Sequence, residues 1–293
     1  MATSTQDNWQ HEYIHSNGVK LHYVTQGEGP LMLMLHGFPE FWYSWRHQIP
    51  EFSPYFKVVA VDLRGYNNSD KPQEKSAYVM DEFIKDVEGI ITELGYEKCI
   101  LVAHDWGGMI AWNFAHTHPQ MVEKLIVLNI PHPTKLSQGL NTFRQLLRSW
   151  YIFFFQLPLL PELYIKAADY KMVEKVFKGM AIDKTAFTSE DISIFKKAVA
   201  QPGALTAMLN YYRNIFKSKR STKNWQKLDM PTLMIWGEND AALGKELTYG
   251  TQSYVNQLQI KYISNCSHWV QQEKPQLVNQ YIREFLELPS PIM

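Results

Sequence analysis

The chain has 293 residues, and its 29 lysines and arginines are matched by 29 aspartates and glutamates. This length suits one large domain or two small ones and is ample for burying an apolar core. A balanced charge excludes the strong basic field that attracts nucleic acid or anionic lipid. We therefore expect no nucleic-acid partner, and a neutral, apolar small molecule fits the composition better than a polyanion.

The sequence contains few signals of where in the cell the protein is located. Cys99 and Cys266 are too few and too far apart for a disulfide framework, which favours a reducing, cytoplasmic setting. Residues 1–20 lack an apolar run, so we expect neither a signal peptide nor a membrane anchor there. The most apolar stretch, residues 150–165, contains prolines and polar residues and falls short of the roughly 20 apolar residues of a membrane span. We interpret it as the lining of a buried space.

The N-terminal part of the chain predicts an antiparallel hairpin, because residues 13–15 and 20–25 flank the turn signal Asn17-Gly18. Short runs rich in Val, Ile and Leu follow, and runs this apolar are typical of parallel strands covered on both faces. Apolar residues at helical spacing over 80–94 and 277–285 predict helices. Alternating strands and helices indicate a mostly parallel α/β sheet. The predicted strands are residues 31–35, 58–61, 99–102, 125–128 and 232–236.

The alternation stops after Pro133 and resumes near Pro231. The residues between carry helical patterns without a convincing strand. We therefore predict a first core part over 1–133, an inserted helical cap over 134–229, and a second core part over 230–293. Such a cap would lie above the carboxyl ends of the strands, where α/β sheets bind ligands.

The run His104-Asp105-Trp106-Gly107-Gly108 directly follows a predicted strand. It has the small-x-nucleophile-x-small pattern of a sharp strand-to-helix turn, with Asp105 at the apex. A serine at this place attacks acyl groups. A carboxylate instead can attack an sp3 carbon that bears a leaving group, forming an alkyl ester with its own side chain. The pattern predicts Asp105 as a nucleophile.

Asp240 and His268 follow in the order nucleophile, acid, base that accompanies such a turn. Taken alone, Asp240 is more typical of a turn carboxylate, and His268 of an ordinary loop histidine. Their order, and their places after predicted strands, favour a catalytic pair. A histidine oriented by a carboxylate is a good general base near neutral pH, here for activating water.

The run His36-Gly37-Phe38-Pro39 follows the strand predicted over 31–35. We expect the main-chain N–H groups of Phe38 and Trp106 to face the oxygen of Asp105 that does not attack. They would help hold the carboxylate ionised and would stabilise the oxyanion formed when water attacks the ester. The histidines show no metal-ligand spacing, so we expect no metal and no cofactor.

These motifs resemble those of the epoxide hydrolases of the α/β-hydrolase fold, of the soluble type, and the likeness covers nearly the whole chain. It implies an ether-bond hydrolase that converts an apolar epoxide to a diol through an ester on Asp105. Only Phe41 and the pair Asn67-Asn68 depart from the usual pattern, without affecting this chemistry. The resemblance rests on the nucleophile turn and on His36-Gly37-Phe38-Pro39-Glu40, Trp42-Tyr43-Ser44-Trp45, Asp62-Leu63-Arg64-Gly65-Tyr66, Ser69-Asp70-Lys71-Pro72 and Ser267-His268-Trp269.

The resemblance also implies two cap tyrosines that hydrogen-bond the epoxide oxygen, and motif matching puts them at Tyr151 and Tyr212. With Phe38 and Trp106 they form the expected substrate-binding set. Helical spacing predicts that both phenols point inward, with Tyr211 as the alternative to Tyr212. This spacing puts Tyr151 on one helical face with Phe143, Leu147 and Phe154. It puts Tyr212 on one face with Leu205, Met208 and Ile215.

Two other functions share parts of this pattern. Haloalkane dehalogenases also resemble the chain, but they hold the departing halide with N–H donors, and Phe38 stands where a donor asparagine is often found. Trp106 meets only half of that requirement. A non-catalytic receptor for a hydrophobic small molecule would be expected to lack one or more of the catalytic residues. Asp105, Asp240 and His268 are all present. We therefore favour epoxide hydrolysis.

Overall fold

The computed structural model describes residues 9–217 and 225–289. Two of the predictions fall partly outside these described residues. They are the absence of a signal peptide or anchor in residues 1–20 and the helical cap over 134–229. In the described part, no helix combines the length and the apolar character that crossing a bilayer requires.

One eight-stranded sheet organises the fold, in the strand order β1-β2-β4-β3-β5-β6-β7-β8. The pairs β1–β2 and β2–β4 are antiparallel, and all other neighbours run parallel. The predicted α/β sheet is thereby confirmed. The strands are β1 (Gln10–Ser16), β2 (Val19–Gln26), β3 (Leu31–Leu35), β4 (Lys57–Val61), β5 (Cys99–His104), β6 (Val122–Leu128), β7 (Thr232–Gly237) and β8 (Leu258–Ile263).

The predicted hairpin is confirmed as β1 and β2, joined at Asn17 and Gly18 with φ values of 47° and 75°. Positive φ at both positions is what the tightest hairpin turn requires, and Asn-Gly tolerates it. The edge strand β8 was not predicted, because its polar residues Gln259 and Lys261 interrupt the apolar run. An edge strand has fewer covered positions and so carries a weaker apolar signal.

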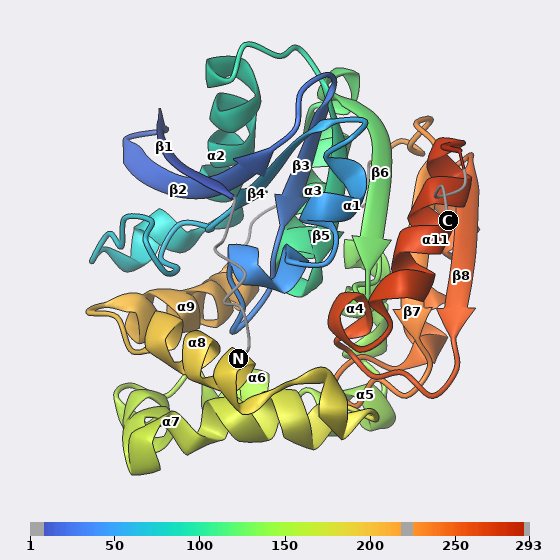
Figure 1. Ribbon diagram of the computed structural model, residues 1–293. Coiled ribbons are helices and arrows are strands. Elements are labelled where there is room, and N and C mark those ends of the chain that lie inside the picture. The colour runs from blue at the N-terminus through green and yellow to red at the C-terminus, as the bar shows by residue number, and fades with distance from the viewer. Residues whose placement is uncertain (1–8, 218–224, 290–293) are drawn as a thin grey trace, which may run out of the picture.

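Helices cover both faces of the sheet (Figure 1): α1 (Ile49–Phe52) and α11 (Pro275–Leu286) lie on one face, α2 (Met80–Glu93) and α3 (Asp105–Thr117) on the other. Helices α2 and α11 confirm the predictions over 80–94 and 277–285. The remaining short elements of the core are α10 (Val270–Glu273), η1 (Trp42–Trp45), η2 (Lys75–Tyr78), η3 (Pro119–Met121), η7 (Lys245–Thr248) and η8 (Thr251–Ser253).

Between β6 and β7 the described residues form helices and no named strand. Figure 1 shows α5 to α9 gathered beyond the arrowheads of the parallel strands. We call residues 133–217 the helical segment. Its elements are α4 (Pro133–Gly139), α5 (Phe143–Arg148), α6 (Trp150–Phe154), α7 (Leu160–Met180), η4 (Lys184–Ala186), α8 (Ser189–Val199), α9 (Ala204–Asn214) and η5 (Ile215–Lys217).

Two expectations for this segment are wrong. The apolar stretch 150–165 does not simply line a buried space, because Leu159 and Leu163 are 71% and 65% exposed. The helical face predicted for Tyr151 also fails, since Phe143 and Leu147 are 76% and 58% exposed. The cause is a break at Ser149, whose φ of −92° and ψ of 15° separate α5 from α6. Helical spacing cannot be continued across such a break.

Candidate active site

Asp105 lies at the sharp turn from β5 into α3, with a φ of 48° that non-glycine residues rarely adopt. Two glycines make the turn possible. A Cβ atom on Gly107 would lie 2.3 Å from the carbonyl oxygen of Leu35, and one on Gly37 would lie 2.4 Å from the Cβ of Asp105. Because the backbone packs this closely, the carboxylate is held at the carboxyl end of the sheet.

Asp105, Asp240 and His268 are brought together from three loops at this end of the sheet. Nδ1 of His268 donates a hydrogen bond to Oδ2 of Asp240 at 2.7 Å, and Nε2 lies 3.6 Å from Oδ2 of Asp105. The side chains of His268 and Asp240 are buried, whereas that of Asp105 is 14% exposed. The imidazole therefore stands between a buried carboxylate and one that reaches a cavity.

Hydrogen bonds to both oxygens fix the carboxylate of Asp240. Its Oδ2 also accepts a hydrogen bond from the Asn129 amide at 2.7 Å, and its Oδ1 accepts the backbone N–H groups of Ala242 and Leu243 at 2.8 and 2.9 Å. Asn129 is fixed in turn, because its Oδ1 accepts the N–H of Gly237 at 2.9 Å. Asn129 was not predicted. Its only sequence signal is a polar residue at the carboxyl end of a buried strand.

The charges of Asp105 and His268 support one another. Burial disfavours the charged form of Asp105, yet the neighbouring positive charge of His268 and the backbone N–H of Phe38 outweigh it and hold the pKa of Asp105 below its ordinary value. Burial likewise disfavours the imidazolium, but the charges of Asp240 and Asp105 raise the pKa of His268 well above its ordinary value. Asp105 is therefore an ionised carboxylate, the form in which a carboxylate can act as a nucleophile without a separate base.

One of the two expected N–H donors is in contact with Asp105. The backbone N–H of Phe38 donates to Oδ1 of Asp105 at 2.8 Å. Trp106 occupies the first turn of α3, where N–H groups have no acceptor within the helix. Its amide remains the predicted second donor.

A buried polar network that was not predicted supports the histidine loop. His104 lies with Nδ1 2.7 Å from Oε2 of Glu40 and donates from Nε2 to the carbonyl oxygen of His268 at 2.9 Å. Glu40 also accepts hydrogen bonds from the N–H of Gly37 and from the amide of Gln272. Burial opposes ionisation of Glu40, but the charge of His104 holds its pKa below the ordinary value. Glu40 and His104 both belong to sequence motifs described above, but their pairing is visible only in the fold.

The predicted tyrosines meet above Asp105. Tyr151 comes from α6 and Tyr212 from α9, and their ring centroids are 5.9 Å apart with planes at 81°. Both line the cavity that contains Asp105 and His268. Neither hydroxyl donates to a protein group in the hydrogen bonds of the described chain, so both are available to a ligand.

The alternative, Tyr211, is engaged elsewhere. Its hydroxyl donates to the carbonyl oxygen of Arg64 at 2.7 Å, and its ring stacks on Phe83 at 4.3 Å. Leu205 and Met208 are buried beside Tyr212, as the helical spacing predicts. The geometry therefore favours Tyr212 over Tyr211.

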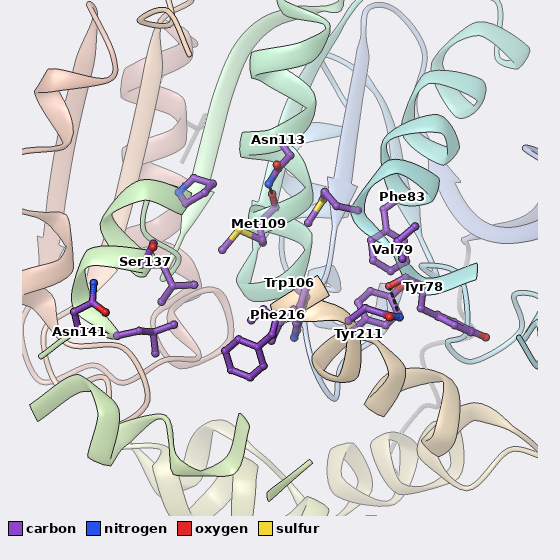
Figure 2. A pocket seen from close by; sticks show the side chains of 16 residues that line it. Tyr78, Val79, Phe83, Trp106, Met109, Asn113, Ser137, Asn141, Tyr211 and Phe216 are labelled. Atoms are coloured by element: carbon purple, nitrogen blue, oxygen red, sulfur yellow. Dashed lines mark hydrogen bonds between the residues drawn. The ribbon is translucent and has the colours of Figure 1, made fainter. Parts of the chain in front are cut away.

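One cavity contains Asp105, and a second lies on the far side of Trp106. The Asp105 cavity, of about 340 Å³, is lined by Phe38, Trp150, Tyr164 and the residues above. A second hollow of about 420 Å³ lies beyond Trp106, and we call it the Trp106 cavity. Figure 2 shows Trp106 and Met109 at its centre, between Asn141 on one side and Tyr78 and Phe83 on the other. A space of about 30 Å³, lined by Asp105, Trp106, Tyr151 and Tyr212, lies between the two.

No group of three or more metal-ligating side chains occurs in the ranges that the structure describes. Both cysteines are free and buried. The arrangement is instead one of an ionised carboxylate, a histidine with its own carboxylate partner, and two phenols around an apolar space. Such a set supports nucleophilic attack followed by hydrolysis.

A family model described as the alpha/beta hydrolase fold matches residues 30–275. The chain is 44% identical over 287 residues to "Epoxide hydrolase 1" of Caenorhabditis elegans, which covers 96% of this chain and 71% of that protein. It is also 44% identical over 282 residues to "Epoxide hydrolase 4" of Homo sapiens, covering 94% of this chain and 77% of that one. The chain belongs to the epoxide hydrolase family of the α/β-hydrolase fold.

Solved structures of epoxide hydrolases share this architecture. The crystal structure of the Bacillus megaterium epoxide hydrolase, in complex with an inhibitor, matches with a TM-score of 0.89 and 37% identity over 94% of this chain and all of that one. A mutant of the same bacterial enzyme was crystallised with its product, a naphthyloxy propanediol. The α/β-hydrolase fold predicted from the sequence is confirmed by both kinds of comparison.

Proposed function

We propose that this epoxide hydrolase family member converts apolar epoxides to vicinal diols in two steps, through an ester on Asp105. The observation that carries the proposal is the meeting of Asp105, His268, Tyr151 and Tyr212 at one cavity. A carboxylate that faces two phenols across an apolar space suits a neutral substrate whose leaving oxygen needs a proton. We also propose that the helical segment forms the cap of the site.

In the first step, an oxygen of Asp105 attacks one ring carbon while the bond from that carbon to the epoxide oxygen breaks. The electron pair of the broken bond goes to the epoxide oxygen, which Tyr151 and Tyr212 hydrogen-bond and one of them protonates. Burial, together with the nearby charge of Asp105, raises the pKa of both phenols well above 10. Both therefore carry a proton to donate at neutral pH.

In the second step, water attacks the carbonyl carbon of the ester and His268 accepts its proton. The bond from that carbon to the alkyl oxygen then breaks, the departing oxygen takes the proton from His268, and the diol leaves. The proton that remains on the carboxyl group returns to the phenol that donated one in the first step, which restores the Asp105 carboxylate. The N–H of Phe38 is placed to stabilise the oxyanion on the non-attacking oxygen. Ester formation removes the negative charge of Asp105, one of the causes that raise the pKa of His268. The pKa of His268 therefore falls at the stage where a neutral base is needed.

The relatives support this assignment over the alternatives. Those reported above are named epoxide hydrolases, and the product held by the bacterial enzyme is a vicinal diol. A dehalogenase needs several N–H donors around a halide. The small space beside Asp105 is lined by the phenols of Tyr151 and Tyr212, and Trp106 is the one side chain among its lining residues that carries an N–H group. A receptor would not need Asp240 and Asn129 to hold His268 so tightly.

The test is diol formation from styrene oxide, followed by repeated turnover in water labelled with heavy oxygen. We expect diol, and we expect peptide mass spectrometry to find the label in Asp105, because water attacks the carbonyl carbon. Diol without label in Asp105 would mean direct attack of water on the ring. Halide release from 1-bromobutane without any diol would favour the dehalogenase.

A further inference from the structure

Most exposed large apolar side chains of the described residues fall within residues 143–164. Soluble monomers rarely expose apolar side chains in such a group without a partner for them. We call this group the apolar patch. Its most exposed members, each more than half exposed, are Phe143, Leu147, Trp150, Leu159, Leu160 and Leu163.

Ring contacts join α6, the start of α7 and η5 into one surface, and α5 directly precedes α6 along the chain. Phe154 packs on Trp150 at 6.0 Å and on Tyr164 at 5.8 Å between ring centroids, which connects α6 to the start of α7. Phe153 stacks on Phe216 at 5.7 Å. The patch therefore extends from the start of α7 across α6 to the end of η5.

Both cavities reach the surface beside this patch. Trp150 and Tyr164, at 58% and 50% exposure, line the Asp105 cavity. Phe216, which is 55% exposed, lines the Trp106 cavity (Figure 2). A ligand that leaves an apolar phase at the patch would thus meet a cavity mouth directly.

The charge next to the patch is positive, although the whole chain is neutral. Lys166, Lys171 and Lys175 of α7 are exposed, and none of the ion pairs between described residues involves them. Lys175 lines the Asp105 cavity together with Trp150 and Tyr164. The whole-chain balance thus conceals a local excess of positive charge. Arg144 and Arg148 share the carboxylate of Glu246. Residues 143–182 carry Arg144, Arg148, Lys166, Lys171, Lys175 and Lys178 against Glu162, Asp169 and Glu174.

We propose that the apolar patch docks on the surface of an anionic phospholipid bilayer, with Lys166, Lys171 and Lys175 against the headgroups. Aromatic and aliphatic side chains beside lysines are the composition of surfaces that lie in the membrane interface without spanning it. A two-fold contact with a second copy presents the same surface on both sides, so it offers the positive excess of the patch no matching negative charge. If the proposed function holds, the docked protein takes apolar epoxides from lipid into the Asp105 cavity.

The test is flotation of the purified full chain with vesicles of phosphatidylcholine alone, or with about one third phosphatidylserine. We expect the protein to float with the anionic vesicles, less with neutral ones, and less in high salt because salt screens exposed charges. Protein that stays in solution with both kinds of vesicle overturns the proposal. Binding is measured without turnover, so the diol assay separately reports on the proposed function.

Matched variants separate the patch from general surface effects. The pair Phe143→Ser and Leu163→Ser should weaken binding to both kinds of vesicle about tenfold or more. The control pair is Tyr13→Ser and Tyr249→Ser, which are 48% and 57% exposed and lie outside the patch. Circular dichroism and thermal unfolding establish that all variants are folded. Equal losses in both pairs would overturn the proposal.

The lysines are tested in the same way. Lys166→Gln with Lys171→Gln should weaken binding to anionic vesicles by about fivefold per lysine and leave neutral vesicles unaffected. Lys98→Gln with Lys261→Gln is the control. Sedimentation velocity tests whether a second copy of the chain covers the patch instead of lipid. A dimer that Phe143→Ser and Leu163→Ser dissociate, without any lipid binding by the original chain, would assign the patch to a second copy.

Discussion

Nε2 of His268 lies 3.6 Å from Oδ2 of Asp105, which is longer than a hydrogen bond between nitrogen and a carboxylate. The two groups are therefore held by their charges more than by a tight bond. This suits a nucleophile that is already ionised and a base that acts later. In a serine hydrolase the same histidine position must first remove the proton of the nucleophile.

The charge of Asp105 should be visible in the titration of His268. We expect the pKa of His268 to lie well above 6.5 and to fall in Asp105→Asn, because that variant removes one of the two carboxylates that raise it. Titration followed by NMR of the imidazole measures both values. An unchanged pKa in Asp105→Asn would contradict the proposed fall of this pKa on ester formation.

The same coupling predicts a pH-dependent stability. A histidine whose pKa is raised by folding stabilises the fold most below its unfolded pKa of about 6.5, and this contribution is lost as pH rises through the folded pKa. Unfolding by denaturant across neutral to alkaline pH measures this decline. We expect it to be smaller in His268→Gln, which has no titrating group at this site. Parallel stability curves for both proteins would argue against the coupling.

Replacing Asp240 by Asn should separate the two proposed steps. The exchange removes the charge that orients and supports the imidazolium, so hydrolysis of the ester should slow by about 10²- to 10⁴-fold while ester formation continues. Intact-protein mass spectrometry with styrene oxide should then detect the alkylated enzyme. Rapid turnover without an adduct would remove Asp240 from the second step.

The roles of the three neighbouring tyrosines can be compared directly. Tyr151→Phe combined with Tyr212→Phe should suppress ring opening by at least about 10²-fold, because the leaving oxygen loses its proton donors. Tyr211→Phe should leave ring opening intact and cost about 1 kcal/mol of stability through the lost bond to Arg64. Burst kinetics and denaturant unfolding measure the two effects. The reverse pattern would make Tyr211 the donor.

The turn at Asp105 should be intolerant of a single added methyl group. Gly107→Ala would put Cβ 2.3 Å from a backbone oxygen, so we expect a loss of about 1–3 kcal/mol in the free energy of unfolding. Gly179→Ala in α7 is the control, since a Cβ there meets nothing within 4 Å. It should be neutral or stabilising by up to about 1 kcal/mol. Equal behaviour of both variants in denaturant unfolding would contradict the packing argument.

Local signals in the sequence predict most of the fold and the nucleophile. Buried parallel strands require near-continuous apolar runs, and a tight strand-to-helix turn requires small residues beside Asp105, so both leave a readable pattern. Motif resemblance then supplied Tyr151 and Tyr212, which no spacing rule could have singled out. Helical spacing supported Tyr212 but failed for Tyr151, because the break at Ser149 has no sequence signature.

Only the tertiary structure decided which distant residues meet. Asn129 bonds Asp240, and Glu40 pairs with His104, across separations along the chain that no local pattern records. Exposure was decided in the same way: the apolar run over 150–165 predicts burial, yet neighbouring helices leave much of it uncovered. A sequence determines which surfaces are apolar and where the chain turns. Which of those surfaces find a partner depends on how all the elements pack together.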